Sequence, residues 1–262
     1  MNAHIRFPVL IFTYIVFLLP LFRALVIPSL NIPAASDKSL SSSHSQLFLD
    51  SACTEDWKKH IPFGIFHGIT TNPILLQRAN VRCTIPELRG LTRVALEDYN
   101  VNCFMIQAWG KDTASLIKCA LELQDFSDKV VVKLPLTSEG VKAAAVVIKM
   151  KVRVCMTACY SSKQVITASS LGAEYLAPYL GRMIDAGKDG MAEVVQMQRM
   201  VEGLRSPMRI FVASIRDPDQ LASLSAAGLH TFTFSPLVAE RLLLEALTES
   251  ASNDFENAAH NM

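Results

Sequence analysis

Short apolar runs alternate with stretches of helical composition throughout the chain after residue 45, and this alternation constrains the fold more than any other feature. Short runs rich in Val, Ile, Leu and Phe and bounded by turn residues are typical of buried strands. The predicted strands are 46–49, 63–68, 102–107, 129–134, 152–156, 174–178, 208–213 and 229–234. The predicted helices are 111–123, 138–149, 161–171, 190–204, 218–226 and 237–247. Helix N-caps are expected at Asp112, Ser138 and Asp217, and helix ends at Gly172 and Gly228.

Eight predicted strands, mostly each followed by a helix, indicate an α/β fold. Their number and spacing over roughly 205 residues predict a single (β/α)8 TIM barrel spanning 46–262, with an extra helix at the C-terminus. The competing architecture is a doubly wound open sheet. That fold usually carries a G-x-G-x-x-G phosphate turn after its first strand, and the sequence contains none.

The first 45 residues differ in composition from the rest of the chain. Residues 7–22 are uncharged and largely apolar, residues 36–45 are rich in serine, and Asp37 is the one acidic residue of 1–45. This pattern predicts a targeting segment and linker outside the fold, directing the protein to an organelle such as a plastid. A simple secretory signal, an incorrectly assigned first exon and a cytoplasmic location are the alternatives. Arg23 and two prolines make the apolar run too short for a stable membrane span in the mature protein.

The charges and cysteines exclude some classes of function. A net charge of +1 without a single-sign run gives no electrostatic footprint for nucleic acid. An anionic substrate would therefore be held by a local site. The six cysteines show no C-x-x-C spacing and lie mostly in apolar runs, so they are interpreted as reduced structural residues.

Polar residues gather at the ends of the predicted strands, where a barrel of this kind carries its chemistry. They are Asp50, Thr70, Thr71, Asn72, Gln107, Lys133, Thr157, Tyr179, Arg182, Ser214 and Arg216.

Lys133 lies in the apolar strand 129–134, with no other charge after Lys129. A central barrel strand is covered on both faces, so an amine there loses hydration, which favours its neutral form. A neutral amine is the form that attacks a carbonyl to make a Schiff base. The alternatives are a lysine that reaches solvent from the strand end, or one paired with a carboxylate such as Asp50.

Schiff-base chemistry also needs groups that transfer protons. A carboxylate, an amide, a hydroxyl and a phenol around one amine can hold a water and move protons. Asp50, Gln107, Thr157 and Tyr179 form such a set, although each alone could be a cap, turn or core residue.

Five ordered motifs resemble those of the transaldolase family, and the resemblance covers essentially all of 46–250. The motifs are LFLD at 47–50, GITTNP at 68–73, VKLPLTSEG at 132–140, APYLGR at 177–182 and ASIR at 213–216. The resemblance implies that Lys133 forms the Schiff base and that Asp50 assists proton transfer. It implies that Thr70 and Asn72 bind substrate hydroxyls, and that Arg182, Ser214 and Arg216 surround the substrate phosphate. The two arginines could instead form surface ion pairs.

Gln107, Thr157 and Tyr179 resemble the fructose-6-phosphate aldolase subgroup, because transaldolases usually have a glutamate where this chain has Gln107 and often a phenylalanine at the tyrosine position. The predicted activity is a class I aldolase that forms or cleaves fructose 6-phosphate from dihydroxyacetone and glyceraldehyde 3-phosphate. No metal and no organic cofactor are expected, since the lysine supplies the electron sink. The alternatives are a transaldolase of the pentose phosphate pathway and a non-catalytic barrel that binds sugar phosphates.

Some positions depart from the family pattern. Ile184 stands where an aspartate is common, and only Asp185 keeps a charge there. Trp109 is bulkier than the residue usual after the third strand, and over the barrel mouth it would alter the acceptor aldehyde. A polar, helical C-terminus resembles the terminal helix that packs on a neighbouring subunit in this family, so a homo-oligomer is expected.

Overall fold

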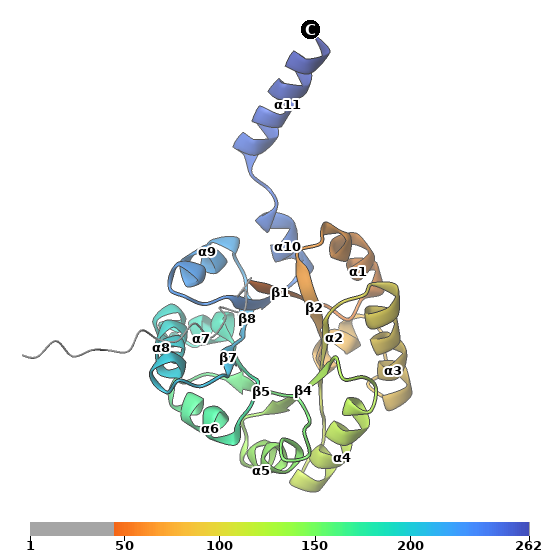
Figure 1. Cartoon of the computed structure of the whole chain (residues 1–262), viewed down its shortest axis with the longest axis vertical. Helices are drawn as coiled ribbons and strands as arrows, with labels where there is room; N and C mark the ends of the chain where they lie inside the picture. The colour runs from red at the N-terminus through yellow and green to blue at the C-terminus, as the bar shows by residue number, and fades with distance from the viewer. Residues whose placement is uncertain (1–44, 262) are drawn as a thin grey trace, which may run out of the picture. The chain divides into compact units, whose positions relative to one another are not determined.

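Nine parallel strands form the wall of a barrel in the computed structural model, which describes residues 45–261 (Figure 1). Hydrogen-bonded neighbours follow the order β7-β6-β5-β4-β3-β2-β1-β9-β8. The strands are β1 (Gln46–Asp50), β2 (Phe66–Thr70), β3 (Cys103–Gln107), β4 (Val130–Pro135), β5 (Val154–Cys159), β6 (Tyr175–Pro178), β7 (Arg209–Ile210), β8 (Val212–Ile215) and β9 (Thr231–Phe234).

The last two strands of this order, β7 and β8, are two parts of one strand interrupted at Phe211. β7 pairs with β6, whereas β8 pairs with β9, and a parallel bridge joins Tyr179 to Ala213. The interrupted strand therefore links the two ends of the sheet. The predicted (β/α)8 TIM barrel is confirmed, with the predicted strand 208–213 divided and extended to Ile215.

Helices surround this wall (Figure 1). The helices are α1 (Thr54–His60), α2 (Pro73–Arg78), α3 (Ile85–Arg93), α4 (Thr113–Gln124), α5 (Ser138–Val147), α6 (Lys163–Leu171), α7 (Leu180–Asp185), α8 (Gly190–Gly203), α9 (Pro218–Ala226) and α10 (Pro236–Leu242), and α11 (Ala246–His260) follows them outside the wall. A 3-10 turn covers Ile61–Phe63 and a π-helical turn covers Val94–Asp98.

Several predicted element ends need correction. The predicted strand 63–68 starts only at Phe66, because a 3-10 turn and Gly64, at φ 73°, occupy its beginning. The cap expected at Ser138 is supplied by Thr137, whose hydroxyl accepts from the Gly140 amide. The predicted helix 237–247 is two helices, α10 and α11.

Most of the other predicted helix ends are confirmed. Asp112 and Asp217 are confirmed as N-caps, and Gly172 as a C-cap in the left-handed conformation. Gly228 is also left-handed, one residue beyond the cap Ala227.

The interior of the barrel is filled by apolar side chains, and the polar site lies one layer above them. Alternate strand residues face the same side of a sheet, so a residue two positions after an interior one also points inward. The interior apolar residues Phe48, Met105, Val131, Cys155 and Ala177 are each followed two positions later by Asp50, Gln107, Lys133, Thr157 and Tyr179. Gly68 leaves room for this layer, since an added Cβ would lie 2.6 Å from the Phe48 ring. The packing of the core thus sets the height of the site.

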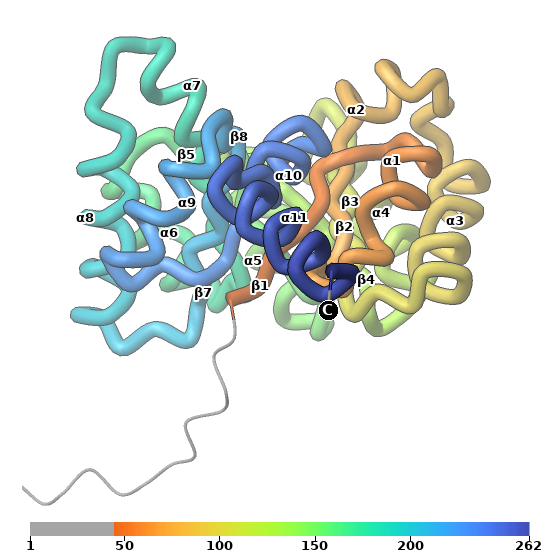
Figure 2. Tube along the Cα trace, turned by 90° about the horizontal axis from the view of Figure 1, so that it is seen from above, coloured from red at the N-terminus to blue at the C-terminus, as the bar shows by residue number. Residues whose placement is uncertain are grey.

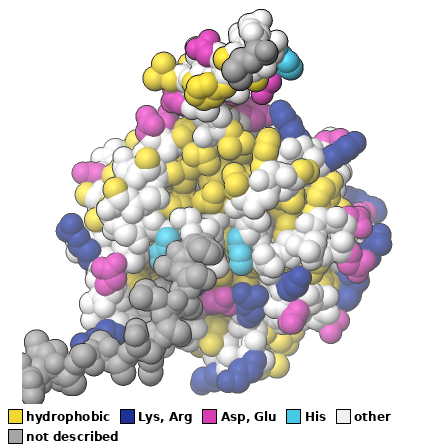
Figure 3. Space-filling model, turned by 45° about the horizontal axis from the view of Figure 1, so that its top comes forward, with side chains coloured by type: hydrophobic (Ala, Val, Ile, Leu, Met, Phe, Trp, Pro, Cys, Tyr) yellow, Lys and Arg dark blue, Asp and Glu magenta, His cyan; other side chains and the backbone are white. Residues whose placement is uncertain are grey.

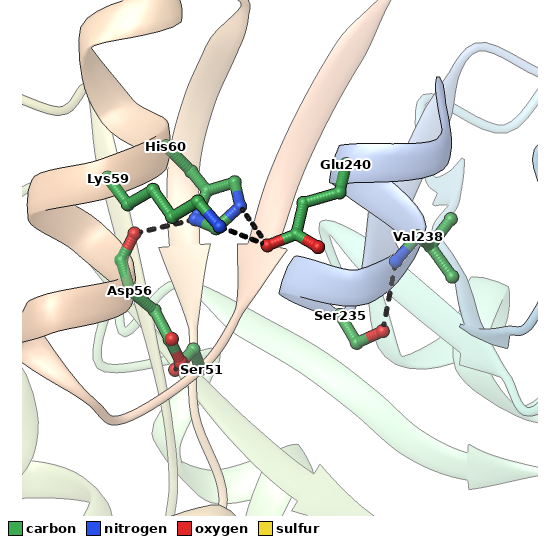
Figure 4. A network of polar contacts seen from close by, with 7 residues as sticks. All are labelled: Ser51, Asp56, Lys59, His60, Ser235, Val238 and Glu240. Carbon is green, nitrogen blue, oxygen red and sulfur yellow. Dashed lines mark hydrogen bonds and ion pairs between the residues drawn. The ribbon is translucent and has the colours of Figure 1, made fainter. Parts of the chain in front are cut away.

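A polar network fixes α10 against α1 (Figure 4). Glu240 accepts from Lys59 Nζ at 2.5 Å and lies 3.6 Å from Nε2 of the buried His60. The His60 Nδ1 atom is 2.8 Å from the Asp56 carbonyl, so both ring nitrogens face acceptors. This network holds the helix that leads to the C-terminal segment.

The C-terminal helix α11 extends away from the barrel (Figure 1) and carries hydrophobic side chains on its surface (Figure 3). None of its residues is buried, and Leu247 and Phe255 are 80% and 73% exposed. Within residues 45–261, no helix is both long and apolar enough to cross a membrane. The predicted targeting segment 1–45 lies, apart from Ser45, outside the described residues.

Candidate active site

A cavity of about 630 Å³ opens where the strands end. It is lined by Asp50, Asn72, Pro73, Ile74, Leu75, Arg78, Gln107, Lys133, Pro135, Thr157, Ala158, Tyr179, Arg182, Asp185, Ala213, Ser214, Arg216 and Thr233. All the predicted site residues except Thr70 line it. The barrel therefore gathers residues of β1, β3, β4, β5, β8 and β9, and of the segments that follow β2 and β6, around a space of a size typical for small-molecule sites.

Lys133 lies in the wall of this cavity between β3 and β5. Its strand neighbours in register are Gln107 and Cys155, and the side chain is 4% exposed. Nζ donates to the Thr71 carbonyl oxygen at 3.3 Å, and no described carboxylate forms an ion pair with it. Lys133 is therefore neither a surface lysine nor, among residues 45–261, part of a salt bridge with Asp50.

The carboxylate of Asp50 is held by the buried hydroxyl of Thr70. Thr70 Oγ1 donates to Asp50 Oδ1 at 2.7 Å and also lies 2.7 Å from Thr233 Oγ1. Thr70 and Thr233 are almost fully buried, so these contacts are shielded from solvent. Thr70 orients Asp50 from below the cavity, and its direct contact with a substrate stays a prediction.

The phenol of Tyr179 lies on the side of Lys133 opposite to Asp50. Its hydroxyl is 2.8 Å from Thr157 Oγ1, and its ring packs edge-on against Tyr160, with 5.7 Å between centroids. The Arg182 guanidinium lies 5.2 Å from the centre of the same ring, a cation–π distance. Gln107 lines the cavity between these groups and Asp50, and its amide makes no hydrogen bond to another described residue.

Asn72 caps the start of α2 and lines the cavity. Its Oδ1 atom accepts from the amides of Ile74 and Leu75, at 3.0 and 3.1 Å, and so caps the helix. The amide nitrogen of Asn72 has no partner among the described residues. It is free to donate to a substrate hydroxyl, as the resemblance implies.

The residues predicted to surround a phosphate, Arg182, Ser214 and Arg216, lie together at one rim of the cavity. Arg216 donates from both terminal nitrogens to the two carboxylate oxygens of Asp185. These hydrogen bonds from Arg216 lower the pKa of Asp185, and the partner carboxylate raises the pKa of Arg216. Arg182 has no ion-pair partner among residues 45–261, so it is the more available of the two guanidinium groups.

Two irregular strand positions shape this rim. Ala158 and Ser214 have positive φ angles of 57° and 60°, and each lies within a register shift of its strand. Such bulges redirect side chains near active sites. Gly181 allows α7 to approach the second bulge, since an added Cβ would be 2.5 Å from the Ser214 carbonyl oxygen.

Two polar residues of the cavity, Arg78 and Thr233, were not predicted from the sequence, and the expected position of Trp109 is corrected. Thr233 is found only through the inward alternation of its strand, and Arg78 only through the placement of α2. Trp109 lines a separate cavity beside α4, with Lys111 and Lys118, and therefore does not restrict the catalytic space.

The chain is similar in sequence to members of one known family, and in fold to a solved structure. The family model described as Transaldolase/Fructose-6-phosphate aldolase matches residues 47–262. A probable transaldolase of Pelotomaculum thermopropionicum is 30% identical over 212 residues, covering 80% of this chain and 95% of the relative. A probable transaldolase of Nitrosopumilus maritimus is 29% identical, covering 80% of this chain and 92% of the relative. Thiamine phosphate pyrophosphorylase from Pyrococcus furiosus superposes with a TM-score of 0.54 at 14% identity, over 75% of this chain and 93% of that chain. This last likeness shows the fold alone.

Proposed function

Because the chain belongs to the transaldolase/fructose-6-phosphate aldolase family and is therefore an enzyme, we propose that it transfers a dihydroxyacetone unit between sugar phosphates through a Schiff base on Lys133. The observation that carries this proposal is the buried amine of Lys133, which faces a polar cavity and has no carboxylate partner among the described residues. The names of the relatives favour this transfer over the free aldolase reaction predicted from the sequence.

The proposed reaction starts when the Lys133 amine attacks the C2 carbonyl of a ketose phosphate. The carbinolamine loses water to give an iminium ion. A base then removes the proton of the C4 hydroxyl, the C3–C4 bond breaks, and its electron pair moves toward the iminium nitrogen to give an enamine. The first aldehyde leaves, the enamine attacks an acceptor aldehyde, and hydrolysis restores the amine.

The proton transfers are assigned to groups on either side of Lys133. The Asp50 carboxylate, oriented by Thr70, serves carbinolamine formation and dehydration. The Tyr179 hydroxyl, fixed by Thr157, exchanges a proton with the C4 oxygen. Gln107 has no ionisable proton and can only orient a water between them.

The second candidate is the fructose-6-phosphate aldolase reaction, in which the enamine is protonated and free dihydroxyacetone is released. The close Thr157–Tyr179 pair beside an amide at Gln107 supports it, because a relay through water favours protonation of the enamine. The two candidates share every step up to the enamine. They differ only in whether a proton or an aldehyde takes the electron pair.

The test is a turnover assay of the purified chain with fructose 6-phosphate, with and without erythrose 4-phosphate. Transfer predicts cleavage that depends on the acceptor, whereas the aldolase predicts free dihydroxyacetone without it. Borohydride added with dihydroxyacetone should leave a three-carbon adduct on Lys133, detected by peptide mass. An adduct on Lys111 or Lys142, or none at all, would disprove the mechanism.

We propose further that α11 packs on a second copy of the chain, giving a homo-oligomer. Leu247, Ala251 and Phe255 recur every four residues and form an apolar stripe along a helix that has no buried residue. Light scattering after gel filtration should show an oligomer. Phe255→Ser together with Leu247→Ser should lower its mass, and a monomeric parent chain would contradict the proposal.

The composition of residues 1–45 supports import into an organelle. A fluorescent protein fused after residue 45 should leave the cytosol in the native cell type. A diffuse cytosolic signal would contradict this proposal.

A further inference from the structure

Two buried threonine hydroxyls form a chain that ends at the carboxylate of Asp50. Thr70 Oγ1 lies 2.7 Å from Asp50 Oδ1 and also 2.7 Å from Thr233 Oγ1. Both threonines are almost completely buried, so these hydrogen bonds lie in a low-dielectric environment that strengthens them. Thr233 also lines the catalytic cavity, as Asp50 does, so the two end residues of the chain border the same space.

Three neighbouring strands bring these residues together. β1 lies between β2 and β9, so Thr70 and Thr233 approach Asp50 from the strands on its two sides. Asp50 stands opposite Thr70 in the register, and Thr233 stands opposite Phe48, one inward position earlier on β1. Figure 2 shows β1 starting at one end of the barrel and α2, which follows β2, lying at the other end. The hydroxyl chain therefore lies toward the end of the barrel at which the cavity opens.

The number of protons on each group sets the direction of this chain. An ionised carboxylate can only accept a hydrogen bond, so Thr70 uses its one hydroxyl proton toward Asp50 Oδ1. The Thr70 oxygen then has only lone pairs left, and Thr233 has to donate its own proton to that oxygen. The chain therefore runs from Thr233 through Thr70 to Asp50.

The two carboxylate oxygens of Asp50 differ as a result. Oδ1 accepts from Thr70, whereas Oδ2 has no hydrogen-bond partner among residues 45–261. We propose that Thr233 is a positioning residue that keeps Thr70 donating to Oδ1 and so leaves the transferable proton of Asp50 on Oδ2. Without the Thr233 hydroxyl, Thr70 could accept a proton from Oδ1 instead, and that proton would point toward Thr70 and not toward the substrate.

This inference rests on the proposed Schiff base, because the step that needs the proton is the loss of water from the carbinolamine on Lys133. Asp50 Oδ2 gives its proton to the carbinolamine hydroxyl, the carbon–oxygen bond breaks, and water leaves. The nitrogen lone pair forms the carbon–nitrogen double bond of the iminium ion, and Asp50 is left as a carboxylate. When water is added back after the transfer, Asp50 recovers the proton. Thr233 contacts no reacting atom and acts only through Thr70.

The test measures how fast the adduct that borohydride can reduce forms on Lys133 with dihydroxyacetone, read by intact mass at increasing times. Borohydride reduces the iminium ion, so this rate includes the dehydration step. Thr233→Val keeps the branched shape but removes the hydroxyl, and it should slow adduct formation by about fivefold, the equivalent of one net hydrogen bond. Thr233→Ser keeps a hydroxyl and should restore most of the rate. Thermal melting of each variant checks that it is folded.

Thr231→Val is the matched control, because Thr231 lies two residues earlier on the same strand. Its side chain is fully buried, its hydroxyl has no hydrogen-bond partner among the described residues, and it does not line the catalytic cavity. This variant should form the adduct at the parent rate. In a chain that already carries Thr70→Val, Thr233→Val should cause no further slowing, because the two hydroxyls act through one path.

Other outcomes separate this inference from the function on which it rests. Adduct formation in Thr233→Val at the rate of the Thr231→Val control would overturn the role of Thr233. A Thr233→Ser chain as slow as Thr233→Val would also overturn it, since the effect would then come from packing of the methyl group. Further slowing by Thr233→Val in the Thr70→Val chain would show that Thr233 acts apart from Thr70, which is equally contrary. The absence of any Lys133 adduct in the parent chain would instead refute the Schiff-base proposal, and this inference with it.

Discussion

Replacing Tyr179 with phenylalanine removes one hydroxyl and leaves the surrounding packing intact. The hydroxyl contacts Thr157 at 2.8 Å, while the ring is held independently by Tyr160 and by the Arg182 guanidinium. The substitution therefore tests proton transfer without displacing the side chain.

The structure gives two magnitudes that differ enough to be separated. Loss of one partly buried hydrogen bond should lower the free energy of unfolding by about 1 kcal/mol. Loss of a general acid–base group should slow cleavage by about 10²–10⁴-fold, which corresponds to roughly 3–5.5 kcal/mol in the activation barrier. A domain stable by about 5–15 kcal/mol stays folded after the smaller change. The lost activity would then belong to the chemical step.

The assay follows fructose 6-phosphate turnover with erythrose 4-phosphate, alongside thermal melting and borohydride trapping with dihydroxyacetone. In Tyr179→Phe, turnover should collapse while the Lys133 adduct still forms, because Schiff-base formation precedes the step that needs the phenol. Thr157→Val removes the same hydrogen bond but keeps the phenol, so it should cost less activity. Near-normal turnover in Tyr179→Phe would refute the reasoning and make Asp50 the first suspect.

Three further predictions concern the groups around this centre. Thr70→Val, which removes the hydroxyl that orients Asp50, should slow adduct formation with dihydroxyacetone by roughly tenfold; an unchanged rate would contradict the orienting role. Burial raises the pKa of the Cys155 thiol to about 12, so iodoacetamide at pH 8 should leave it unlabelled in the native protein and label it after unfolding, as read by peptide mass. The hydrogen bond from Lys59 lowers the pKa of Glu240 below its ordinary 4.5, so the stability it contributes is present above that pH and is lost as pH falls through the lowered value. The melting temperatures of the parent and Glu240→Gln chains should therefore converge on acidification, and a constant difference would contradict this assignment.

Strand positions were largely predictable because buried barrel strands leave a strong local pattern. Lys133 was found for the same reason: a charge inside an apolar run is conspicuous in sequence. The break at Phe211 was not predictable, because it depends on two different neighbours, β6 for Arg209–Ile210 and β9 for Val212–Ile215. Sequence composition records burial, but it does not record which strand is the partner.

Most of the polar residues that line the cavity were predicted from the sequence, but the hydrogen bonds between them were not. Asp50 was expected near Lys133, yet its carboxylate accepts from Thr70, whose hydroxyl also contacts Thr233, and not from the amine. Thr233 lies far along the chain from both, so only the closure of the barrel brings it close. The short helices carrying Arg78 and Arg182 escaped prediction, because six-residue helices leave too little periodicity to detect.

The ion pair between Asp185 and Arg216 limits the hydrogen-bond donors that Arg216 could offer to a phosphate in the cavity. Asp185 engages both terminal nitrogens of Arg216, while Nε has no partner among residues 45–261. A guanidinium has five N–H donors, so Arg216 can keep Asp185 and still donate from its remaining edge. A phosphate at this rim would thus meet the negative charge of Asp185 as well as Arg216, which weakens the attraction that Arg216 alone would provide. In the proposed reaction, Arg182 has no such ion-pair partner among residues 45–261 and would supply most of the attraction. The proposed phosphate-binding group then also lies over the ring of Tyr179, the residue assigned to proton transfer.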